Sequence, residues 1–243
     1  MNEIAQNIQA IREKITKAAL ACGRDPGEIT LCAASKMNDA ERVRYAVEHG
    51  VDCCGENRVQ ELTEKLPAGA YGDKPVHFIG RLQTNKVNKV VGAVDLIQSV
   101  DRLELLECIE KTAEKKNVVQ KILLEVNIAD EESKAGFTAE KTEEICSEMG
   151  KYPHVRLVGL MAIPPVSQKK GDNLIFFEKM RTLCVDISRK KYDNVIMECL
   201  SMGMSDDYED AIACGSTMVR VGTAIFGRRN YPDKPDLAKE INK

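Results

Sequence analysis

The sequence lacks both an excess of charge of one sign and any long apolar run. Its 35 lysine and arginine residues face 38 aspartate and glutamate residues, so the net charge is -3. Without a strong positive field, neither nucleic acid nor an anionic membrane is an expected partner. No apolar run approaches the roughly 20 residues of a membrane-spanning helix, and residues 1–20 lack the apolar block of a signal peptide. We therefore expect a cytoplasmic protein.

The sequence also lacks the cysteine and histidine spacing of a metal site. Its nine cysteines are an odd number without a CxxC pair, and most lie in apolar stretches such as Leu31–Ala33. They are expected to be small buried hydrophobic residues in a reducing compartment. His49, His77 and His154 are far apart and match no cysteine or carboxylate at a ligand spacing. No zinc site is predicted, and His77, alone on an apolar run, is expected to be structural.

What the sequence does have is ordinary globular composition. It is 43% hydrophobic and 30% charged over 243 residues, far from the low hydrophobicity of disordered chains. An α/β barrel usually runs to about 250 residues as one domain. No long linker, low-complexity stretch or seam rich in proline and glycine divides the chain, so residues 1–243 are expected to form one barrel domain.

The first part of the chain is predicted to form a helix followed by a strand and a second helix. Isoleucines at helical spacing predict an amphipathic helix over residues 2–21, closed by the turn at 25–27. A short apolar run follows at 29–35. Asn38 and Glu41 then form a predicted capping pair for a helix that ends at His49–Gly50.

The same unit recurs along the chain and yields eight strand candidates. They lie at 29–35, 51–54, 76–79, 94–98, 120–128, 155–163, 195–200 and 218–226. Runs such as 121–126 are almost continuously apolar, which is typical of parallel strands covered by helices. A Rossmann fold would need a glycine-rich turn after an early strand, and 35–38 is not one. The predicted fold class is α/β, a single (β/α)8 TIM barrel with an extra N-terminal helix.

Polar residues follow several of these runs, at the end of a barrel where active sites form. Lys36 would lie at the barrel mouth, where burial and nearby cations can lower the pKa of a lysine enough for Schiff-base chemistry. The alternative is a lysine that extends into water. Arg220 lies inside the eighth run, where a charge needs a partner, either a carboxylate on a neighbouring strand or a ligand. Asn57 follows the second run and is either a ligand contact or a helix cap.

Small residues follow the seventh and eighth runs, where many such barrels bind phosphate. They are Ser201 and Gly203 in one loop, and Gly222 and Thr223 in the other. Ser205 is expected to cap the next helix, which would begin near Asp206. Each glycine alone could be a turn, but together these residues indicate a phosphate site.

Seven motifs then occur in order along almost the whole chain. They are Ala34-Ser-Lys36, Gly55-Glu-Asn57-x-Val-Gln-Glu61, His77-Phe-Ile-Gly80-x-Leu-Gln-x-Asn-Lys86, Ser133-Lys-x-Gly136, Gly159-Leu-Met161-x-Ile163, Leu200-Ser-Met-Gly-Met-Ser-Asp-Asp207 and Arg220-x-Gly-Thr-Ala-Ile-Phe-Gly227. In this combination the chain resembles the pyridoxal 5′-phosphate (PLP) homeostasis protein family. The resemblance implies a PLP-binding barrel similar to the N-terminal domain of alanine racemase.

The resemblance also implies roles for individual residues. Lys36 would form the internal aldimine with PLP, and Ser201, Gly222 and Thr223 would contact its phosphate. Arg220 would face the pyridine nitrogen, and Asn57 would lie beside the ring. A guanidinium cannot accept a proton, so it favours an unprotonated pyridine and weakens PLP as an electron sink. Racemases of this type add a tyrosine from a second domain, for which we expect no room after the last strand.

The function implied is that of a carrier or buffer of PLP, with possible transfer to PLP-dependent apo-enzymes and no robust catalytic activity. A monomer is the simpler expectation. Two alternatives stay open: a barrel-only, PLP-dependent amino-acid racemase, and an enzyme without PLP that uses Lys36 as a Schiff-base lysine on a phosphosugar.

Overall fold

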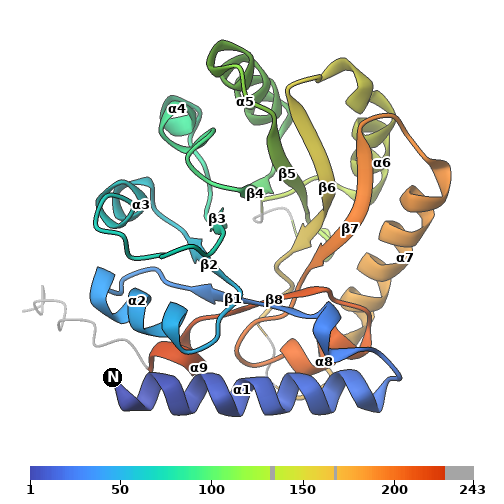
Figure 1. The fold of residues 1–243 in the computed structure, drawn as a ribbon. Helices are drawn as coiled ribbons and strands as arrows, with labels where there is room; N and C mark the ends of the chain where they lie inside the picture. The colour runs from blue at the N-terminus through green and yellow to red at the C-terminus, as the bar shows by residue number, and fades with distance from the viewer. Residues whose placement is uncertain (132–134, 167–168, 228–243) are drawn as a thin grey trace, which may run out of the picture.

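The computed structural model describes residues 1–131, 135–166 and 169–227. Eight parallel strands form a closed barrel in chain order (Figure 1). They are β1 Thr30–Ala34, β2 Cys53–Glu56, β3 Val76–Phe78, β4 Leu96–Val100, β5 Gln120–Val126, β6 Val155–Ala162, β7 Val195–Ser201 and β8 Met218–Val221. The first and last strands close the ring, with Thr30 opposite Met218 and Ala33 opposite Val221. The predicted fold class is confirmed.

Helices surround this ring of strands (Figure 1). They are α1 Asn2–Ala21, α2 Ala40–Glu48, α3 Val59–Lys65, α4 Val87–Val90, α5 Leu103–Lys116, α6 Ala139–Glu148, α7 Leu174–Lys190, α8 Tyr208–Ala213 and α9 Thr223–Phe226, with short 3-10 turns η1 Pro26–Glu28, η2 Thr84–Lys86 and η3 Met149–Lys151. None of the helices in the described parts of the chain is long and apolar enough to cross a bilayer.

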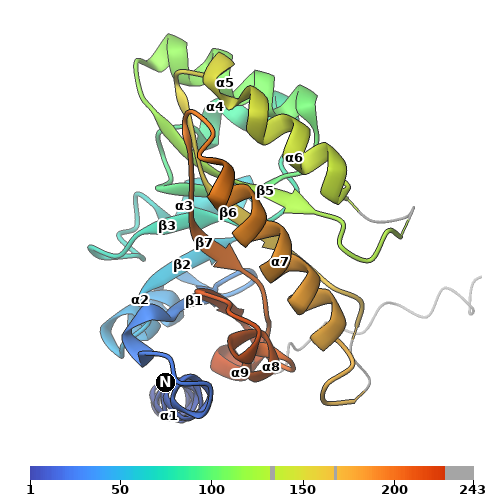
Figure 2. The same cartoon turned by 90° about the vertical axis from the view of Figure 1, so that its right-hand side faces the viewer.

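The predicted N-terminal helix covers the place where the barrel closes. Helix α1 packs against α2, α8 and α9, and Figure 2 shows it end-on beneath them. Ile4, Ile8, Ile11 and Ile15 are its buried face. Asn7 Nδ2 also donates a hydrogen bond to the carbonyl of Ile225 at 3.0 Å. The apolar stripe read from the sequence therefore fastens the first helix to the last strand–helix unit.

The main core lies between strands and helices, and two small apolar groups lie apart from it. One group is Leu96, Leu123, Val158 and Met161, and the other is Cys32, Cys53 and Met218. All seven side chains come from barrel strands. They fill the barrel interior with packed side chains, as expected for an eight-stranded barrel.

Three details of the sequence prediction are wrong. The eighth strand ends at Val221, and residues 223–226 form α9 instead of continuing the strand. Helix α2 is capped by Asp39, which accepts from the backbone N–H of Arg42 at 2.8 Å, rather than by Asn38. Ser205 does not cap α8, because its hydroxyl accepts a 3.3 Å hydrogen bond from Ala224 N.

Parts of two predictions fall outside the described residues. These are Ser133 and Lys134 of the fourth motif, and residues 228–243 at the end of the expected barrel domain.

Candidate functional site

Lys36 lies in a strained turn at the carboxyl end of β1. The residue after it, Met37, has a backbone φ of 61°, a region that a residue with a side chain seldom occupies. Two hydrogen bonds hold this conformation: Met37 N donates to Glu61 Oε2 at 2.6 Å, and Asn38 N donates to the Ser35 carbonyl at 3.2 Å. The turn is therefore held by a carboxylate from α3 as well as by its own backbone.

A buried charge network lies under this turn. Glu56, the last residue of β2, is fully buried, and its Oε1 accepts from Ser35 Oγ at 2.6 Å and from Lys65 Nζ at 2.8 Å. Tyr71 donates to the same oxygen at 3.1 Å, and burial raises the pKa of Tyr71, which keeps it a donor.

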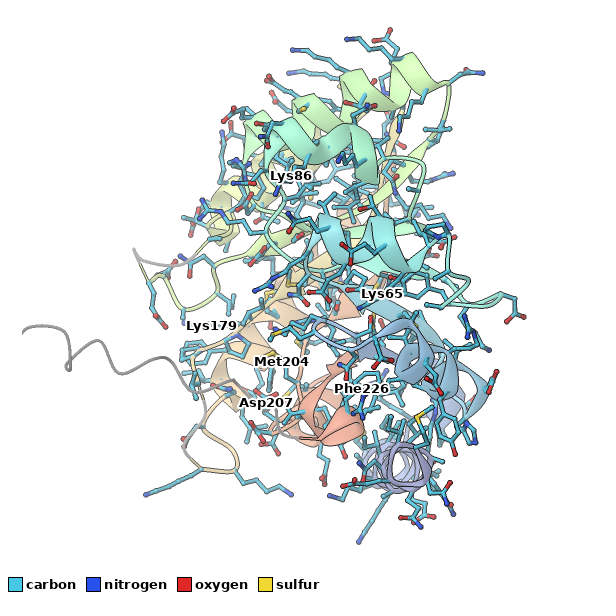
Figure 3. The ribbon with its side chains drawn as sticks, turned by 90° about the vertical axis from the view of Figure 1, so that its left-hand side faces the viewer. Lys65, Lys86, Lys179, Met204, Asp207 and Phe226 are labelled. Carbon is cyan, nitrogen blue, oxygen red and sulfur yellow. The ribbon has the colours of Figure 1, made fainter. Side chains whose placement is uncertain are left out.

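Lys65 joins this network to the turn itself. Its ammonium donates to the Ser35 carbonyl at 2.9 Å and to Glu61 Oε2 at 3.1 Å. Lys65 is 6% exposed although it is the last residue of a short helix (Figure 3). Glu56, Glu61 and Lys65 thus connect β2 and α3 to the residues on both sides of Lys36.

A cavity of about 470 Å³ opens at the seam between β1 and β8, and it brings together three of the predicted site residues. Lys36, Gly222 and Thr223 all line it, together with Ala34 and Arg42. Gly222 approaches β1 closely: a Cβ there would lie 3.3 Å from both the Cβ and the carbonyl oxygen of Ala34. The cavity therefore combines a lysine amine and a guanidinium with small residues on the β8 side, and Glu3, Asp39 and Phe226 also line it.

The two loops that were predicted to bind phosphate contact each other. Ser205, after β7, accepts from Ala224 N of α9. Gly203 has a φ of 94°, and a Cβ on it would lie 2.6 Å from Ala211 Cβ, so only glycine fits there. Figure 3 labels Met204 and Asp207 of the first loop and Phe226 at the end of the second. The pair of loops is a tightly packed unit.

Arg220 and Ser201 lie deeper, inside the barrel, and do not line this cavity. Arg220 is 4% exposed and donates to Ser201 Oγ at 2.6 Å and to the Ala162 carbonyl at 2.9 Å. Burial lowers the pKa of Arg220. Among the described residues, no carboxylate oxygen lies within 4.0 Å of its guanidinium nitrogens. The buried ion pair that the sequence left open is therefore not formed there.

Ser201 continues this contact into a buried polar chain. It donates to Gln98 Oε1 at 2.7 Å, and Gln98 Nε2 lies 2.9 Å from His77 Nδ1. Ser201, Gln98 and His77 are all buried. The hydroxyl proton of Ser201 is thus already engaged in the hydrogen bond to Gln98. Through this chain Arg220 is linked to the opposite wall of the barrel.

Asn57 follows β2, but it is not a helix cap. Helix α3 begins after Arg58, without a side-chain cap. Asn57 Oδ1 is instead a buried oxygen with no hydrogen-bond partner among the described residues. Gly80 packs directly on this segment, since a Cβ there would lie 2.2 Å from the Asn57 carbonyl oxygen. Asn57 does not line the cavity at the β1–β8 seam, but its unpaired buried oxygen is suited to a ligand donor.

Sequence reasoning missed Glu125 of β5, a largely buried carboxylate that interacts electrostatically with Arg220. Burial raises its pKa to about 7, the nearby Asp101 adds to that shift, and Arg220 opposes it. A carboxylate in an otherwise apolar run was the available signal. For Lys65 no such signal exists, because a lysine at the end of a helix usually lies in water.

The sequence is similar to known proteins over most of its length. Residues 1–230 match the family model described as alanine racemase, N-terminal domain. Two proteins named pyridoxal phosphate homeostasis protein are similar: one from Aquifex aeolicus is 42% identical over 226 residues, 93% of this chain and 98% of that protein. The other, from Escherichia coli, is 40% identical over 238 residues, 96% of this chain and 100% of that protein.

A solved structure is similar over the same length. It is PipY of Synechococcus elongatus with PLP bound, which has a TM-score of 0.80 and 30% identity. The match covers 92% of this chain and 100% of that chain.

The network under the Lys36 turn predicts the effect of Lys65→Met. Removing the ammonium leaves Glu56 buried without its charge partner, which should cost about 3–5 kcal/mol of unfolding free energy. Urea unfolding followed by circular dichroism measures this loss. The double variant Glu56→Gln, Lys65→Met should recover part of it, because no unpaired charge is then buried. A Lys65→Met protein as stable as the parent would contradict the assigned role.

The raised pKa of Glu125 predicts a pH-dependent cost. Burial raises the pKa of Glu125 from its ordinary value of 4.5 to about 7, so the folded protein holds this proton to a higher pH than the unfolded chain does. Stability is therefore lost as the pH rises from 4.5 to 7, by about 1–3 kcal/mol. Glu125→Gln should remove this loss when unfolding free energies at pH 5 and pH 8 are compared. Glu64→Gln, at an exposed carboxylate, is the control. An identical change in unfolding free energy between pH 5 and pH 8 for both variants would disprove the prediction.

Proposed function

Because the chain belongs to the family of pyridoxal phosphate homeostasis proteins, we propose that it binds PLP and serves as a carrier or buffer of that cofactor. The observation that carries the proposal is the cavity at the β1–β8 seam, where Lys36 meets Gly222 and Thr223. A lysine amine beside small residues from the loop after strand eight is the combination that an aldehyde with a phosphate group requires.

The residues present fit PLP in three further respects. Gly222 leaves room that a Cβ would take up against Ala34. Asn57 Oδ1 is buried and unpaired among the described residues, so the ring hydroxyl of PLP would satisfy it. Arg220, below the cavity, is fixed by Ser201 and the Ala162 carbonyl and has no carboxylate partner among the described residues, so its positive charge would be available to a ligand that reaches that depth.

These residues would divide the work of holding the cofactor. PLP supplies an aldehyde that condenses reversibly with an amine, and a ring that withdraws electrons. Lys36 would bind the aldehyde carbon, while Gly222 and Thr223 hold the phosphate and Asn57 contacts the ring. The network of Glu56, Glu61 and Lys65 would keep the lysine turn in place.

If Arg220 faces the ring nitrogen of PLP, as the resemblance implies, it would favour storage over catalysis. A guanidinium keeps its protons and cannot protonate the ring nitrogen, so the ring withdraws electrons less strongly. The phosphate contact of Ser201 stays a prediction. Its hydroxyl accepts from Arg220 and donates to Gln98, and reaching a phosphate would require it to release Gln98. In the free protein its task is to orient Arg220.

Lys36→Ala tests the anchor. The purified parent, after addition of PLP, should show a visible absorption band that borohydride bleaches, and peptide mass mapping should find the reduced pyridoxyl group on Lys36. Lys36→Ala should lose the adduct and bind PLP at least tenfold more weakly. Lys179→Ala, an exposed lysine of α7, is the matched control. A parent protein that forms no absorption band would favour the alternative of a phosphosugar enzyme without PLP. A pyridoxyl adduct that persists in Lys36→Ala would show that Lys36 is not the residue that binds PLP.

Amino-acid exchange separates a carrier from a racemase-like enzyme. The PLP-loaded protein, incubated in deuterated water with a panel of amino acids, should leave the α-hydrogen of each in place. The same preparation should restore activity to a PLP-dependent apo-enzyme. Rapid α-deuteration of any amino acid, absent in Lys36→Ala, would instead identify a catalyst.

A further inference from the structure

A group of soft donor atoms lies inside the barrel, away from the cavity at the seam. Cys32, Cys53 and His77 come from β1, β2 and β3, which are adjacent in the ring (Figure 1). One sulfur or nitrogen atom of each lies within 4.8 Å of the other two. The three residues are only 0%, 2% and 6% exposed. The spacing of 21 and 24 residues hid this group from sequence reasoning, which looked for ligands close together in the chain.

Strand register explains why they meet. Cys32 is paired directly with Cys53, and His77 is paired with Gly55, two residues further along β2. Residues two apart on a strand point to the same face, so the side chains of Cys53 and His77 both enter the barrel interior. The cluster is therefore fixed by backbone pairing on three strands and does not depend on a loop.

One pair of the donor atoms already has the separation that a metal ion would impose. Cys53 Sγ lies 3.6 Å from His77 Nδ1. Zinc bonds of about 2.3 Å to sulfur and about 2.0–2.1 Å to nitrogen place these two donors about 3.6 Å apart around a tetrahedral ion. Both cysteines are free thiols. Binding would need little movement of the strands.

The chemistry of the donor set selects the kind of ion. Among the described residues the cluster offers two thiols and an imidazole and contains no carboxylate, and Met218 belongs to the same small apolar group as both cysteines. Sulfur and imidazole ligands favour Zn²⁺ and Cu⁺ over Mg²⁺ or Ca²⁺. Two thiolates also neutralise Zn²⁺, which matters because an unbalanced charge at this depth is costly.

We propose that Cys32, Cys53 and His77 form a buried binding site for a thiophilic cation, Zn²⁺ or Cu⁺. The ion replaces the thiol protons, which pass to solvent, and takes the His77 Nδ1 lone pair. In the free protein Gln98 Nε2 lies 2.9 Å from that nitrogen and 3.1 Å from Met218 Sδ. The amide of Gln98 therefore moves away when the ion enters. This proposal does not rest on PLP binding by Lys36.

The test is a metal titration of the whole protein, stripped with a chelator and kept reduced. Zn²⁺ is titrated against a chromophoric chelator, and Cu⁺ is titrated anaerobically in a separate arm. One equivalent of at least one ion should bind, and binding should release the protons that the two thiols still carry at the pH of the assay. The variant Cys32→Ser, Cys53→Ser should bind that ion at least a hundredfold more weakly. Cys54→Ala is the matched control: it changes the next residue of β2, whose side chain lies in the outer core, and should bind like the parent.

X-ray absorption of the parent keeps the test decisive if the double variant fails to fold. The first shell of the bound ion should contain two sulfur atoms and at least one imidazole nitrogen. Failure of both ions to bind the parent would overturn the site. A first shell of oxygen and nitrogen alone would also overturn the site, as would equal binding by the folded double variant. In each of these cases the three side chains would serve only to pack the core.

Discussion

The buried carboxylate of Glu56 is the constraint on which the lysine turn depends. It ends β2 fully buried and accepts from Ser35, Lys65 and Tyr71 through one oxygen. A charge at that depth is tolerated only when it is paired, so the position of Lys65 follows from that of Glu56. Lys65 in turn fixes the Ser35 carbonyl and Glu61, and Glu61 holds Met37 in a left-handed conformation. The backbone turn that carries Lys36 is thus held by residues that do not themselves line the cavity.

The barrel interior shows a second way to bury charge. Arg220 has no carboxylate within 4.0 Å among the described residues and relies on neutral oxygens of Ser201 and Ala162. Ser201 donates a hydrogen bond to Gln98 Oε1, and Gln98 Nε2 in turn lies within hydrogen-bond distance of His77 Nδ1. A chain of hydrogen bonds in a medium of low polarity stiffens all its members. The proposed cation site shares His77 with this chain, so binding of an ion there would change the hydrogen bonds of Gln98.

The architecture could be predicted from the sequence because it rests on local periodicity and on the number of strand–helix units. All eight strands occur where apolar runs lie, and the isoleucine stripe correctly predicted α1. Short-range polar details were less predictable. Asp39 rather than Asn38 caps α2, and Ser205 binds the neighbouring loop, because hydroxyls and carboxylates choose among several nearby donors. Residues 223–226 are apolar enough for a strand, yet they turn into α9 after Gly222.

Of the site, the sequence could indicate Lys36, Arg220 and the small residues of the last loops through position alone. Lys65 and the cluster of Cys32, Cys53 and His77 could not be found, because burial of a lysine and contact across three strands are properties of strand register.

The seam between β1 and β8 has a consequence for biosynthesis. Lys36 and Thr223 line one cavity but leave the ribosome nearly two hundred residues apart. At synthesis rates of about 5–20 residues per second, the nascent chain carries an incomplete site for about ten seconds or more. The cofactor pocket is therefore among the last parts of the molecule to form.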